Sequence, residues 1–449
     1  MCIIGTRPEI IKMEPVIRSL RREHGSSRVS LVHSGQHYDV KMSEYFLKEL
    51  GYPKPDLNLR VGSGSHAEQT ARMIVGYEKA ICRLKPDIVL AQGDTNTVVA
   101  AGLAAIKLKI PFGHVESGLR CFDRSMPEEI NRTIADDCAQ YCFAPTAISA
   151  SNLMREGISP KRIFVTGNTI VEACKRNLTI ARKHSTILKR LGLEDQRKLI
   201  LITAHREENT DNPTRLKSII KSIQNLKDFQ IVYPIHPRAR KMLRLFSLDN
   251  ALKRKHILTT EPLGYWDFLR LLEASNVVLT DSGGVQEEAL TVGVPCLTLR
   301  YVTERPETVR VGANFLVGTE PSIITKQVKR VSQDPELRRK LRSIDNPLGD
   351  EMAGERIAKI ITNSRNGGVE HARYMRDGAP SFRLLRVLKN RSMKWLERKC
   401  PGCHVMVVYD SAGEPVLPDS TLQLKVGWHV QAVGEEFEIQ LLANELHSL

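Results

Sequence analysis

The chain has 449 residues, of which 41% are hydrophobic and 26% are charged, and its formal net charge is +15. These values are typical of a soluble globular protein with two or three domains. No segment has the long apolar run of a membrane-spanning helix, and the first residues, MCIIGTRPE, lack the pattern of a secretory signal. The sequence therefore predicts a cytoplasmic protein with no membrane span.

The positive charge is spread along the chain, with a dense patch at residues 383–399. It fits an anionic substrate, but a scattered surplus is more often a solvated surface than a nucleic-acid footprint, so we expect no nucleic-acid partner. Most of the nine cysteines stand alone in apolar runs, which is typical of reduced thiols. The one CxxC, at residues 400–403, lacks a second pair and favours a turn over a zinc site.

Short apolar runs alternate with helical patterns from the first residues to about residue 362. The expected strands form two sets: residues 2–4, 29–33, 87–91, 112–115, 141–144 and 163–166, then 199–203, 230–235, 256–259, 276–280, 296–299 and 314–317. Helix-length segments lie between them, for example 8–23, 97–108, 212–226, 285–292 and 322–332. This alternation predicts an α/β protein with two doubly wound parallel sheets, in domains of residues 1–175 and 176–362. Ligands of such sheets bind beyond the carboxyl ends of the strands, so we expect the site in the cleft between the two domains.

The pattern changes after residue 365, where Asn-Gly-Gly at residues 366–368 resembles a linker. A basic helical pattern follows at 382–399. Short alternating runs come next, at 405–409, 422–424 and 430–433, before a final helical pattern at 436–446. We expect residues 366–449 to form a small α+β module rich in hairpins.

Cations follow the first expected strand, in the segment GTRPEIIK. Gly5 permits the turn, Pro8 suits a first helical position, and Arg7 and Lys12 are close enough to a helix start to reach a diphosphate. A plain strand-to-helix turn with surface cations explains this segment equally well.

Three carboxylates stand at strand ends or helix starts of the first half: Asp94, Glu116 and Glu128. An acid in the first turn of a helix, such as Glu128, is explained by the helix dipole alone. Three acids that converge on one sheet edge are harder to explain as surface. Their pKa values would be pushed apart, which suits general acid and base work on a C–H or O–H bond.

Second-half strand ends carry His205, which could support departure of a leaving group or hold a phosphate, and Arg305, which adds a cation for a phosphate. The segment LTDSGGVQEEAL ends a strand in Gly283 and Gly284. Backbone N–H groups there suit a phosphate, and a carboxylate one turn later could accept hydrogen bonds from sugar hydroxyls. An ordinary strand-to-helix turn remains an equal alternative for this segment.

Signatures of metal or dinucleotide chemistry are missing from the sequence. It contains no P-loop and no GxGxxG with an acid at the required distance, and no acidic cluster accompanies His33 and His37. We expect no metal and no cofactor.

Seven motifs in this order, GTRPEIIK, QGDTNT, HVESGLR, PEEINR, TAHREEN, TDSGGVQEEA and TERPE, resemble the non-hydrolysing UDP-N-acetylglucosamine 2-epimerases over about residues 1–362. The resemblance implies a glycosyltransferase-B-like fold, with two Rossmann-like domains facing a cleft and a last helix that crosses back to the first. It also implies inversion at C2 of the sugar, by anti elimination of UDP to 2-acetamidoglucal and re-addition of UDP. We expect a UDP-sugar substrate and a homodimer.

Carried over motif by motif, the resemblance implies catalytic roles for Asp94, Glu116, Glu128 and His205. It implies substrate or UDP binding by the following residues: Arg7, Lys12, Ser282, Gly283, Gly284, Glu288 and Arg305. It leaves open which carboxylate removes the C2 proton and which returns it, and Glu129 is easily confused with Glu128. Gln36 and His37 resemble part of the region where bacterial members hold an activating second substrate molecule. The surrounding HYDVKMSEYF departs from that form, so such activation stays open.

The segment GEPVLPDSTLQLKVGWHVQAVGEEFEI resembles a TrkA-C type regulatory module, which implies a small ligand and a dimerising role for the C-terminal module. Three alternative functions remain. One is epimerisation of another UDP-2-acetamido sugar, such as a diacetamido uronic acid, and the second is a hydrolysing epimerase. The third is a nucleotide-sugar sensor without turnover.

Overall fold

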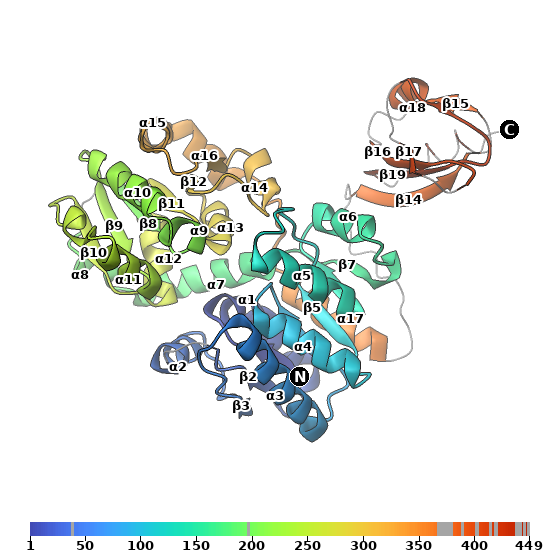
Figure 1. Ribbon diagram of the computed structural model, residues 1–449, viewed down its shortest axis with the longest axis horizontal. Helices are drawn as coiled ribbons and strands as arrows, with labels where there is room; N and C mark the ends of the chain where they lie inside the picture. The colour runs from blue at the N-terminus through green and yellow to red at the C-terminus, as the bar shows by residue number, and fades with distance from the viewer. Residues whose placement is uncertain are drawn as a thin grey trace. The chain divides into compact units, whose positions relative to one another are not determined.

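The computed structural model describes residues 1–36, 40–194, 198–365, 380–387, 390–399, 404–412, 415–416, 421–435, 442 and 446. The chain forms two compact units, Met1–His371 and Ala372–Leu449. The first unit contains two parallel sheets with helices around them, and the second contains small antiparallel sheets (Figure 1).

The first sheet has seven parallel strands in the order β3-β2-β1-β4-β5-β6-β7. Their bounds are β1 Cys2–Ile4, β2 Leu31–His33, β3 Leu57–Asn58, β4 Val89–Gln92, β5 Phe112–Val115, β6 Tyr141–Ala144 and β7 Ile163–Val165. Because β1, β4 and β5 are neighbours and point the same way, the segments that follow them open onto one edge of the sheet.

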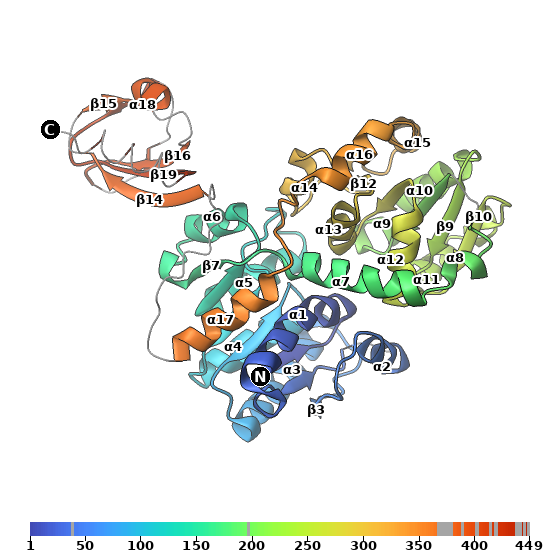
Figure 2. The same cartoon turned by 180° about the vertical axis from the view of Figure 1, so that it is seen from behind.

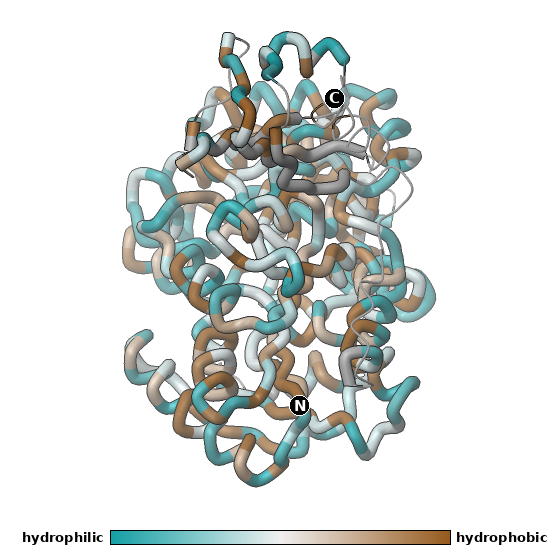
Figure 3. Tube along the Cα trace, turned by 90° about the vertical axis from the view of Figure 1, so that its right-hand side faces the viewer, coloured by the Kyte–Doolittle hydropathy of each residue, from teal (hydrophilic) through white to brown (hydrophobic). Residues whose placement is uncertain are grey.

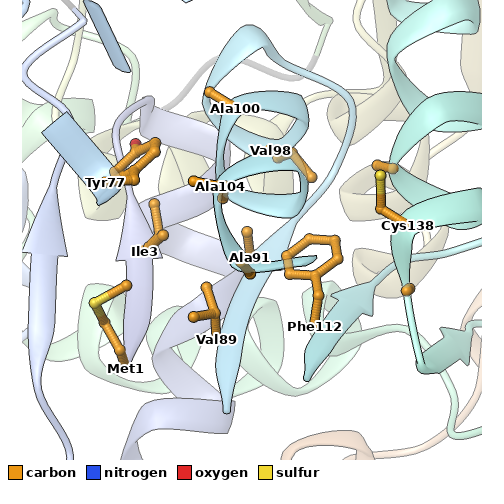
Figure 4. Close-up of a cluster of buried hydrophobic side chains, with 14 of the residues drawn as sticks. Met1, Ile3, Tyr77, Val89, Ala91, Val98, Ala100, Ala104, Phe112 and Cys138 are labelled. Carbon is orange, nitrogen blue, oxygen red and sulfur yellow. The ribbon is translucent and has the colours of Figure 1, made fainter. Parts of the chain in front are cut away.

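Helices cover both faces of this sheet (Figures 1 and 2). They are α1 Arg7–His24, α2 Val40–Glu49, α3 His66–Leu84, α4 Asn96–Lys107, α5 Pro127–Cys138 and α6 Ala147–Arg155, with 3-10 turns at Ser26–Arg28 and Pro160–Arg162. Figure 4 shows how Tyr77, Val98 and Cys138 of three of these helices pack on strand residues such as Phe112. The sequence of α4 contains four alanines and Gly102, small residues that let the helix lie close to the sheet. A Cβ at Gly102 would stand 3.1 Å from the Phe112 ring.

The second sheet has six parallel strands in the order β10-β9-β8-β11-β12-β13. These are β8 Leu199–Thr203, β9 Gln230–Pro234, β10 Ile257–Thr260, β11 Val277–Thr280, β12 Cys296–Thr298 and β13 Asn314–Leu316. Its helices are α8 Ile187–Arg190, α9 Glu207–Thr210, α10 Pro213–Asn225, α11 Pro237–Leu245, α12 Tyr265–Ala274, α13 Gly283–Val292, α14 Pro306–Arg310, α15 Pro321–Ser332 and α16 Pro335–Ser343, with a 3-10 turn at Asp249–Leu252.

Hydrophobic stretches, in brown, alternate with hydrophilic stretches, in teal, along the chain trace of Figure 3. In α10 the buried residues Leu216, Ile219, Ile220 and Ile223 recur at helical spacing, so one side of the helix faces the core of the second sheet.

The chain passes from the first sheet to the second through α7, Thr169–His184, and returns through α17, Ala353–Arg365, which packs on α1. The fit between α17 and α1 is close, because a Cβ at Gly354 would lie 2.5 Å from the Pro15 carbonyl oxygen. The two passages meet where the Asn168 N–H donates to the Leu348 carbonyl at 2.7 Å.

The second unit has an antiparallel sheet in the order β14-β19-β16-β17 and a two-stranded sheet of β15 and β18. The strands are β14 Pro380–Arg386, β15 Arg391–Ser392, β16 His404–Tyr409, β17 Pro415–Val416, β18 Gln423–Leu424 and β19 His429–Glu435, and helix α18 spans Met393–Lys399. Val387, Met393, Val408 and Val430 belong to its core.

The predicted fold class, two parallel α/β sheets and a small α+β module, is confirmed, and most elements lie within two residues of their expected bounds. The helix predicted at 382–399 is wrong in its first part. Residues 380–386 form β14, because their backbone pairs along the whole of β19 and outweighs the local helical pattern. The predicted linker at 366–368, the CxxC and the predicted last helix, apart from Leu442 and Leu446, lie outside the described residues. No helix in the described part of the chain is long and apolar enough to cross a membrane.

Candidate active site

The residues predicted for the site follow strands at the carboxyl edges of both sheets. In the first sheet they follow β1 (Arg7, Lys12), β4 (Asp94) and β5 (Glu116), and Glu128 opens α5. In the second sheet they follow β8 (His205), β11 (Ser282, Gly283, Gly284, Glu288) and β12 (Arg305). Parallel strands deliver their carboxyl ends to one edge, which is why residues far apart in sequence meet here.

Lys12, Glu116, Glu287 and Arg305 form a closed ring of alternating charges, which we call the charge ring. Lys12 Nζ lies 2.5 Å from Glu116 Oε2 and 2.8 Å from Glu287 Oε2. Arg305 donates from Nη2 to Glu116 Oε1 at 2.9 Å and from Nε to Glu287 Oε1 at 2.9 Å. Lys12 and Glu116 lie in the half that contains the first sheet, whereas Glu287 and Arg305 lie in the half that contains the second. Buried ion pairs therefore join the two halves of the unit.

The two carboxylates of the charge ring differ in proton affinity. Burial raises the pKa of Glu116, and Lys12 offsets that rise only in part. Burial also acts on Glu287, but Arg305 and Lys12 outweigh it and hold the pKa of Glu287 below its ordinary value. Glu116 is therefore the carboxylate of the ring that takes up a proton more readily, as general acid or base work requires.

The backbone and one further side chain fix the position of Glu116. Its φ of 70° lies in the left-handed region, which is uncommon for a residue other than glycine and occurs often at functional sites. Gln92, the last residue of β4, donates from Nε2 to Glu116 Oε2 at 2.8 Å.

Asp94 is held by Arg132, a fully buried arginine of α5. Arg132 donates from Nη2 to Asp94 and from Nη1 to Glu129 at 2.7 Å. Burial alone would raise the pKa of Asp94, but Arg132 and other nearby cations hold it below its usual value. Asp94 is thus an anion beside a fixed cation.

Glu128 and Glu129 are adjacent in sequence but have different surroundings. Glu129 is buried and accepts the backbone N–H groups of Cys121 and Phe122, at 3.2 and 2.9 Å, which ties down the preceding loop. Glu128 is half-buried and pairs with Arg206 of the second sheet at 2.8 Å. Of the two acids, Glu128 is the one that pairs with a residue of the second half.

His205 is oriented by Asp281, the residue after β11. Its Nδ1 lies 3.3 Å from Asp281 Oδ1, and Asp281 also accepts the backbone N–H groups of His205 and Arg206. Burial lowers the pKa of His205, although Asp281 acts in the opposite direction. With Nδ1 turned to a carboxylate, Nε2 is the nitrogen left to face a ligand.

The start of α13 has the features of an anion site. Its N-cap, Ser282, makes no side-chain capping hydrogen bond within the described structure, so the first N–H groups of the helix are not satisfied by it. A Cβ at Gly283 would lie 2.6 Å from Arg305 Nη1, whereas one at Gly284 would meet no described atom within 4 Å. Gly283 therefore lets the Arg305 cation approach the helix start, and Gly284 leaves the backbone open.

Arg7 forms a second link between the halves, and Glu288 lies within its electrostatic influence. The Arg7 guanidinium lies 4.7 Å from the Phe46 ring centroid and 5.6 Å from that of Phe268, and it donates to the Leu263 carbonyl at 3.3 Å. Burial raises the pKa of Glu288 to about 7, against the effect of Arg7. A carboxyl group of this kind, one turn beyond the helix start, suits neutral hydroxyl partners.

The structure brings Lys12, Glu116 and Arg305 into direct contact. The nearest partners of Lys12 are carboxylates, whereas the sequence predicted that Lys12 could reach a diphosphate. Asp94, Glu128 and His205 pair with Arg132, Arg206 and Asp281, none of which was predicted as a site residue. Glu287 and Glu304 also belong to the site and were not predicted. Glu287 had a sequence signal, since it precedes Glu288 in VQEEAL, but buried ion pairing has no pattern in sequence. Gln36 accepts a hydrogen bond from Thr97 at 2.8 Å, and His37 lies outside the described residues.

Among the residues that the structure describes, no group of three or more His, Cys, Asp or Glu side chains could hold a metal ion. The cations of the site are arginines and a lysine, two of which, Arg300 and Arg305, hold the buried Glu304 at 2.8 and 2.5 Å. Arg305 and Arg300 outweigh burial and hold the pKa of Glu304 well below its usual range.

The unit has two Rossmann-like sheets. An acid of the first half pairs with a cation that lies beside the glycine-containing start of a helix in the second half. These features define an α/β protein of the glycosyltransferase-B-like class. A model of the UDP-N-acetylglucosamine 2-epimerase family matches residues 19–362, and the chain belongs to this family.

A UDP-N-acetylglucosamine 2-epimerase from Methanocaldococcus jannaschii is 48% identical over 367 residues, which cover 80% of this chain and 98% of the relative. The crystal structure of the M. jannaschii enzyme in complex with UDP-GlcNAc and UDP has a TM-score of 0.75 at 47% identity, and the match covers 80% and 98% of the two chains. A UDP-2,3-diacetamido-2,3-dideoxy-D-glucuronate 2-epimerase from Pseudomonas aeruginosa is 38% identical over 370 residues, with 80% and 98% covered. The residues beyond 362 lie outside the family match.

Proposed function

We propose that the protein interconverts UDP-N-acetylglucosamine and UDP-N-acetylmannosamine by inversion at C2, without net hydrolysis. The pairing of Glu116 with Arg305 at 2.9 Å, beside the start of α13, carries the proposal. It joins a carboxyl group suited to proton transfer to a cation suited to a diphosphate, and those are the two chemical tasks of this reaction.

The C2 hydrogen of such a sugar is not acidic enough for simple removal. In the proposed route a carboxylate takes that proton while the C1–O bond breaks, and the bonding electrons leave with the UDP oxygen. This anti elimination gives 2-acetamidoglucal and UDP. A carboxylic acid then protonates C2 from the opposite face, and UDP adds back to C1. Both fragments must stay in place between the two steps, which requires firm binding and exclusion of water.

Asp94, Glu116 and Glu128 are the groups that we propose for the two proton transfers, and Glu128 and His205 are both half-buried. His205 and Arg305 would stabilise the departing diphosphate, and Ser282, Gly283 and Gly284 would bind it through the N–H groups of α13. Glu288 would accept the ribose hydroxyls, with Arg7 beside it. Lys12 would hold Glu116 in place, because their atoms lie 2.5 Å apart.

Incubation with UDP-N-acetylglucosamine in deuterium oxide tests this proposal. Proton NMR should show conversion to UDP-N-acetylmannosamine and deuterium at C2 of both sugars. Glu128→Gln should slow the exchange, whereas Asp137→Asn, which removes an exposed carboxylate from the same helix, should not. Release of free N-acetylmannosamine would point to a hydrolysing epimerase, and tight UDP-sugar binding without any C2 exchange would point to a sensor.

Epimerisation of another UDP-2-acetamido sugar is the second candidate, which the 38% identity to the diacetamido-glucuronate epimerase favours. Parallel exchange assays with both UDP-sugars at equal concentration would separate the two. A higher kcat/KM for the diacetamido uronate would replace the first proposal and leave the reaction type unchanged.

For the C-terminal unit we propose a regulatory role in which it binds a small ligand and joins two chains into a homodimer. Its antiparallel sheet and the sequence resemblance to TrkA-C modules support this role. A chain without residues 366–449 should be monomeric, or should respond differently to substrate concentration. Unchanged activity, substrate response and molecular mass by light scattering would rule the role out.

A further inference from the structure

His114 is a buried histidine of β5 that lies two residues before Glu116. Its Nδ1 is 2.6 Å from Oδ1 of Asp136, and its Nε2 is 2.7 Å from the carbonyl oxygen of Gly93. Both ring nitrogens therefore face oxygen atoms.

These two contacts, together with strand β5 itself, connect His114 to the chain segments that carry Asp94, Glu116 and Glu128. Gly93 is the residue before Asp94, and Asp136 lies on α5, the helix whose first turn contains Glu128. The third segment, with Glu116, is the continuation of the strand that carries His114 itself.

The partners of His114 define its charge. The Gly93 carbonyl can only accept a hydrogen bond. Asp136 accepts hydrogen bonds from the Ser117 hydroxyl, from the Gly118 N–H at 3.2 Å and from Arg120 Nη2 at 2.7 Å. Although burial opposes ionisation, His114 and its other partners lower the pKa of Asp136 to about 2, so Asp136 is an acceptor as well. A ring between two acceptors satisfies both only when each nitrogen donates a proton.

We propose that His114 is an imidazolium that acts as a positioning residue, fixing Asp94, Glu116 and Glu128 relative to one another through Gly93 and Asp136. This role rests on the proposed function, whereas the charge of the ring does not. Arg120 also pairs at 2.5 Å with Glu156, whose side chain is one-third exposed, so the buried part of the cluster consists of His114, Asp136 and Arg120. The charged groups that face the ring come from α5 and from the loop after β5.

Asp136 also fixes the loop on which Glu116 stands. It binds Ser117, Gly118 and Arg120, the residues that follow Glu116, so the left-handed backbone at Glu116 is held by the carboxylate that His114 holds. Removal of either donor of the ring should therefore displace the reacting carboxylates without touching the start of α13, where UDP is proposed to bind.

Nitrogen NMR of the full chain, labelled with ¹⁵N-histidine, tests the charge of the ring. Both His114 nitrogens should show the shifts of nitrogens that carry a proton, because each faces a hydrogen-bond acceptor. His114→Asn identifies these signals by their loss. An unprotonated nitrogen on this ring at neutral pH would overturn the imidazolium, whether or not the protein is an epimerase.

Kinetics tests the positioning role. His114→Asn keeps a donor toward Asp136, and His114→Gln keeps one toward Gly93, so each loses one of the two contacts. A displacement of about 1 Å can lower kcat on the order of 100-fold, and we expect losses of this size with UDP affinity unchanged.

Phe112→Leu is the matched control, because Phe112 lies on the same strand, its ring stacks 6.3 Å from that of His114, and its side chain belongs to the apolar core (Figure 4). It should lower the melting temperature and leave kcat near that of the wild type. The positioning role is overturned if the His114 variants match this control in kcat, or if their UDP affinity falls in parallel with kcat. A wild type with no C2 exchange would instead refute the proposed function. The NMR result on the charge of His114 would remain valid in that case.

Discussion

Lys12 shows what a single buried charge does in this site. It holds Glu116 and Glu287, two carboxylates that would otherwise repel each other with Arg305 alone between them. Loss of one partner from a buried ion pair costs about 3–5 kcal/mol, because the remaining charge stays buried and uncompensated. We expect Lys12→Met to lower the free energy of unfolding by about that amount, measured by urea denaturation.

Lys175→Met is the control for this prediction. Lys175 pairs with Glu351 at 2.9 Å, but both side chains are about half exposed, so its loss should cost less than about 1 kcal/mol. A second variant, Lys12→Met with Glu287→Gln, should recover part of the lost stability because it removes the unpaired carboxylate. Equal effects of Lys12→Met and Lys175→Met would show that the charge ring contributes nothing to stability.

Glu288 makes stability depend on pH. Burial raises its pKa in the folded protein to about 7, from an ordinary value of 4.5. Between these values the folded protein binds more protons than the unfolded chain, so stability is lost as pH rises toward 7. The difference between a pKa of 4.5 and a pKa of about 7 corresponds to about 3 kcal/mol.

Glu288→Gln cannot titrate, so we expect the variant to gain about 3 kcal/mol relative to the wild type between pH 5 and 8. Urea unfolding at several pH values, without nucleotide, measures this difference. Glu9, whose pKa burial also raises to about 7, contributes equally to both proteins and cancels. A difference between the two proteins that stays constant with pH would show that folding does not raise the pKa of Glu288.

Elements were easier to predict than their contacts. Buried parallel strands such as β5 and β8 are continuous apolar runs bounded by turn residues, so the sequence alone predicted their bounds correctly. The two-residue strand β3 was missed because its pairing is defined by β2 and not by its own sequence. β14 was mistaken for a helix for the same reason, since its partner β19 lies far away in the chain.

The site follows the same rule. Acids and glycines at strand ends were visible in the sequence because strand ends are local features. The partners that determine their charge states, such as Arg132 for Asp94 and Glu287 for Arg305, depend on how helices and sheets meet, and neither was predicted. His114 was visible in the sequence only as part of the HVESGLR motif, because its contacts to Gly93 and Asp136 join three separate elements.

At the scale of elements, the two passages between the sheets meet at a pair of glycines. Gly349 has a φ of 115°, and a Cβ there would lie 2.9 Å from the Gly167 Cα. Gly349→Ala should destabilise the protein by the strain of the backbone, about 1–2 kcal/mol, together with a packing clash of about 1–3 kcal/mol. Thermal unfolding measures the sum.

Gly157→Ala separates these two contributions. Gly157 also has a positive φ, of 85°, but a Cβ there would meet no described atom within 4 Å, so only the backbone strain applies. If the two alanine variants unfold at the same temperature, the close packing of Gly349 against Gly167 does not contribute to the free energy of unfolding.

For the whole molecule, the net charge of +15 should attract a doubly charged anionic ligand such as a UDP-sugar over long distances. Mobile ions screen this attraction, because the Debye length falls from about 30 Å at 0.01 M to about 8 Å at 0.15 M ionic strength. We expect the association rate of UDP, followed by stopped-flow fluorescence, to fall as sodium chloride is added across this range. The dissociation rate should change little, because the buried contacts of Arg305 and the start of α13 lie inside the site and are screened less.

Glycine betaine at matched osmolality is the control, since it carries no net charge and should leave the association rate unchanged. Removal of exposed cations far from the site, for example by Lys253→Gln and Lys255→Gln together, should lower the rate at low salt and have no effect at high salt. An association rate independent of ionic strength would mean that the excess positive charge does not attract the nucleotide. Capture of the nucleotide would then depend only on the cations within the site, where Lys12 and Arg305 are already paired with carboxylates.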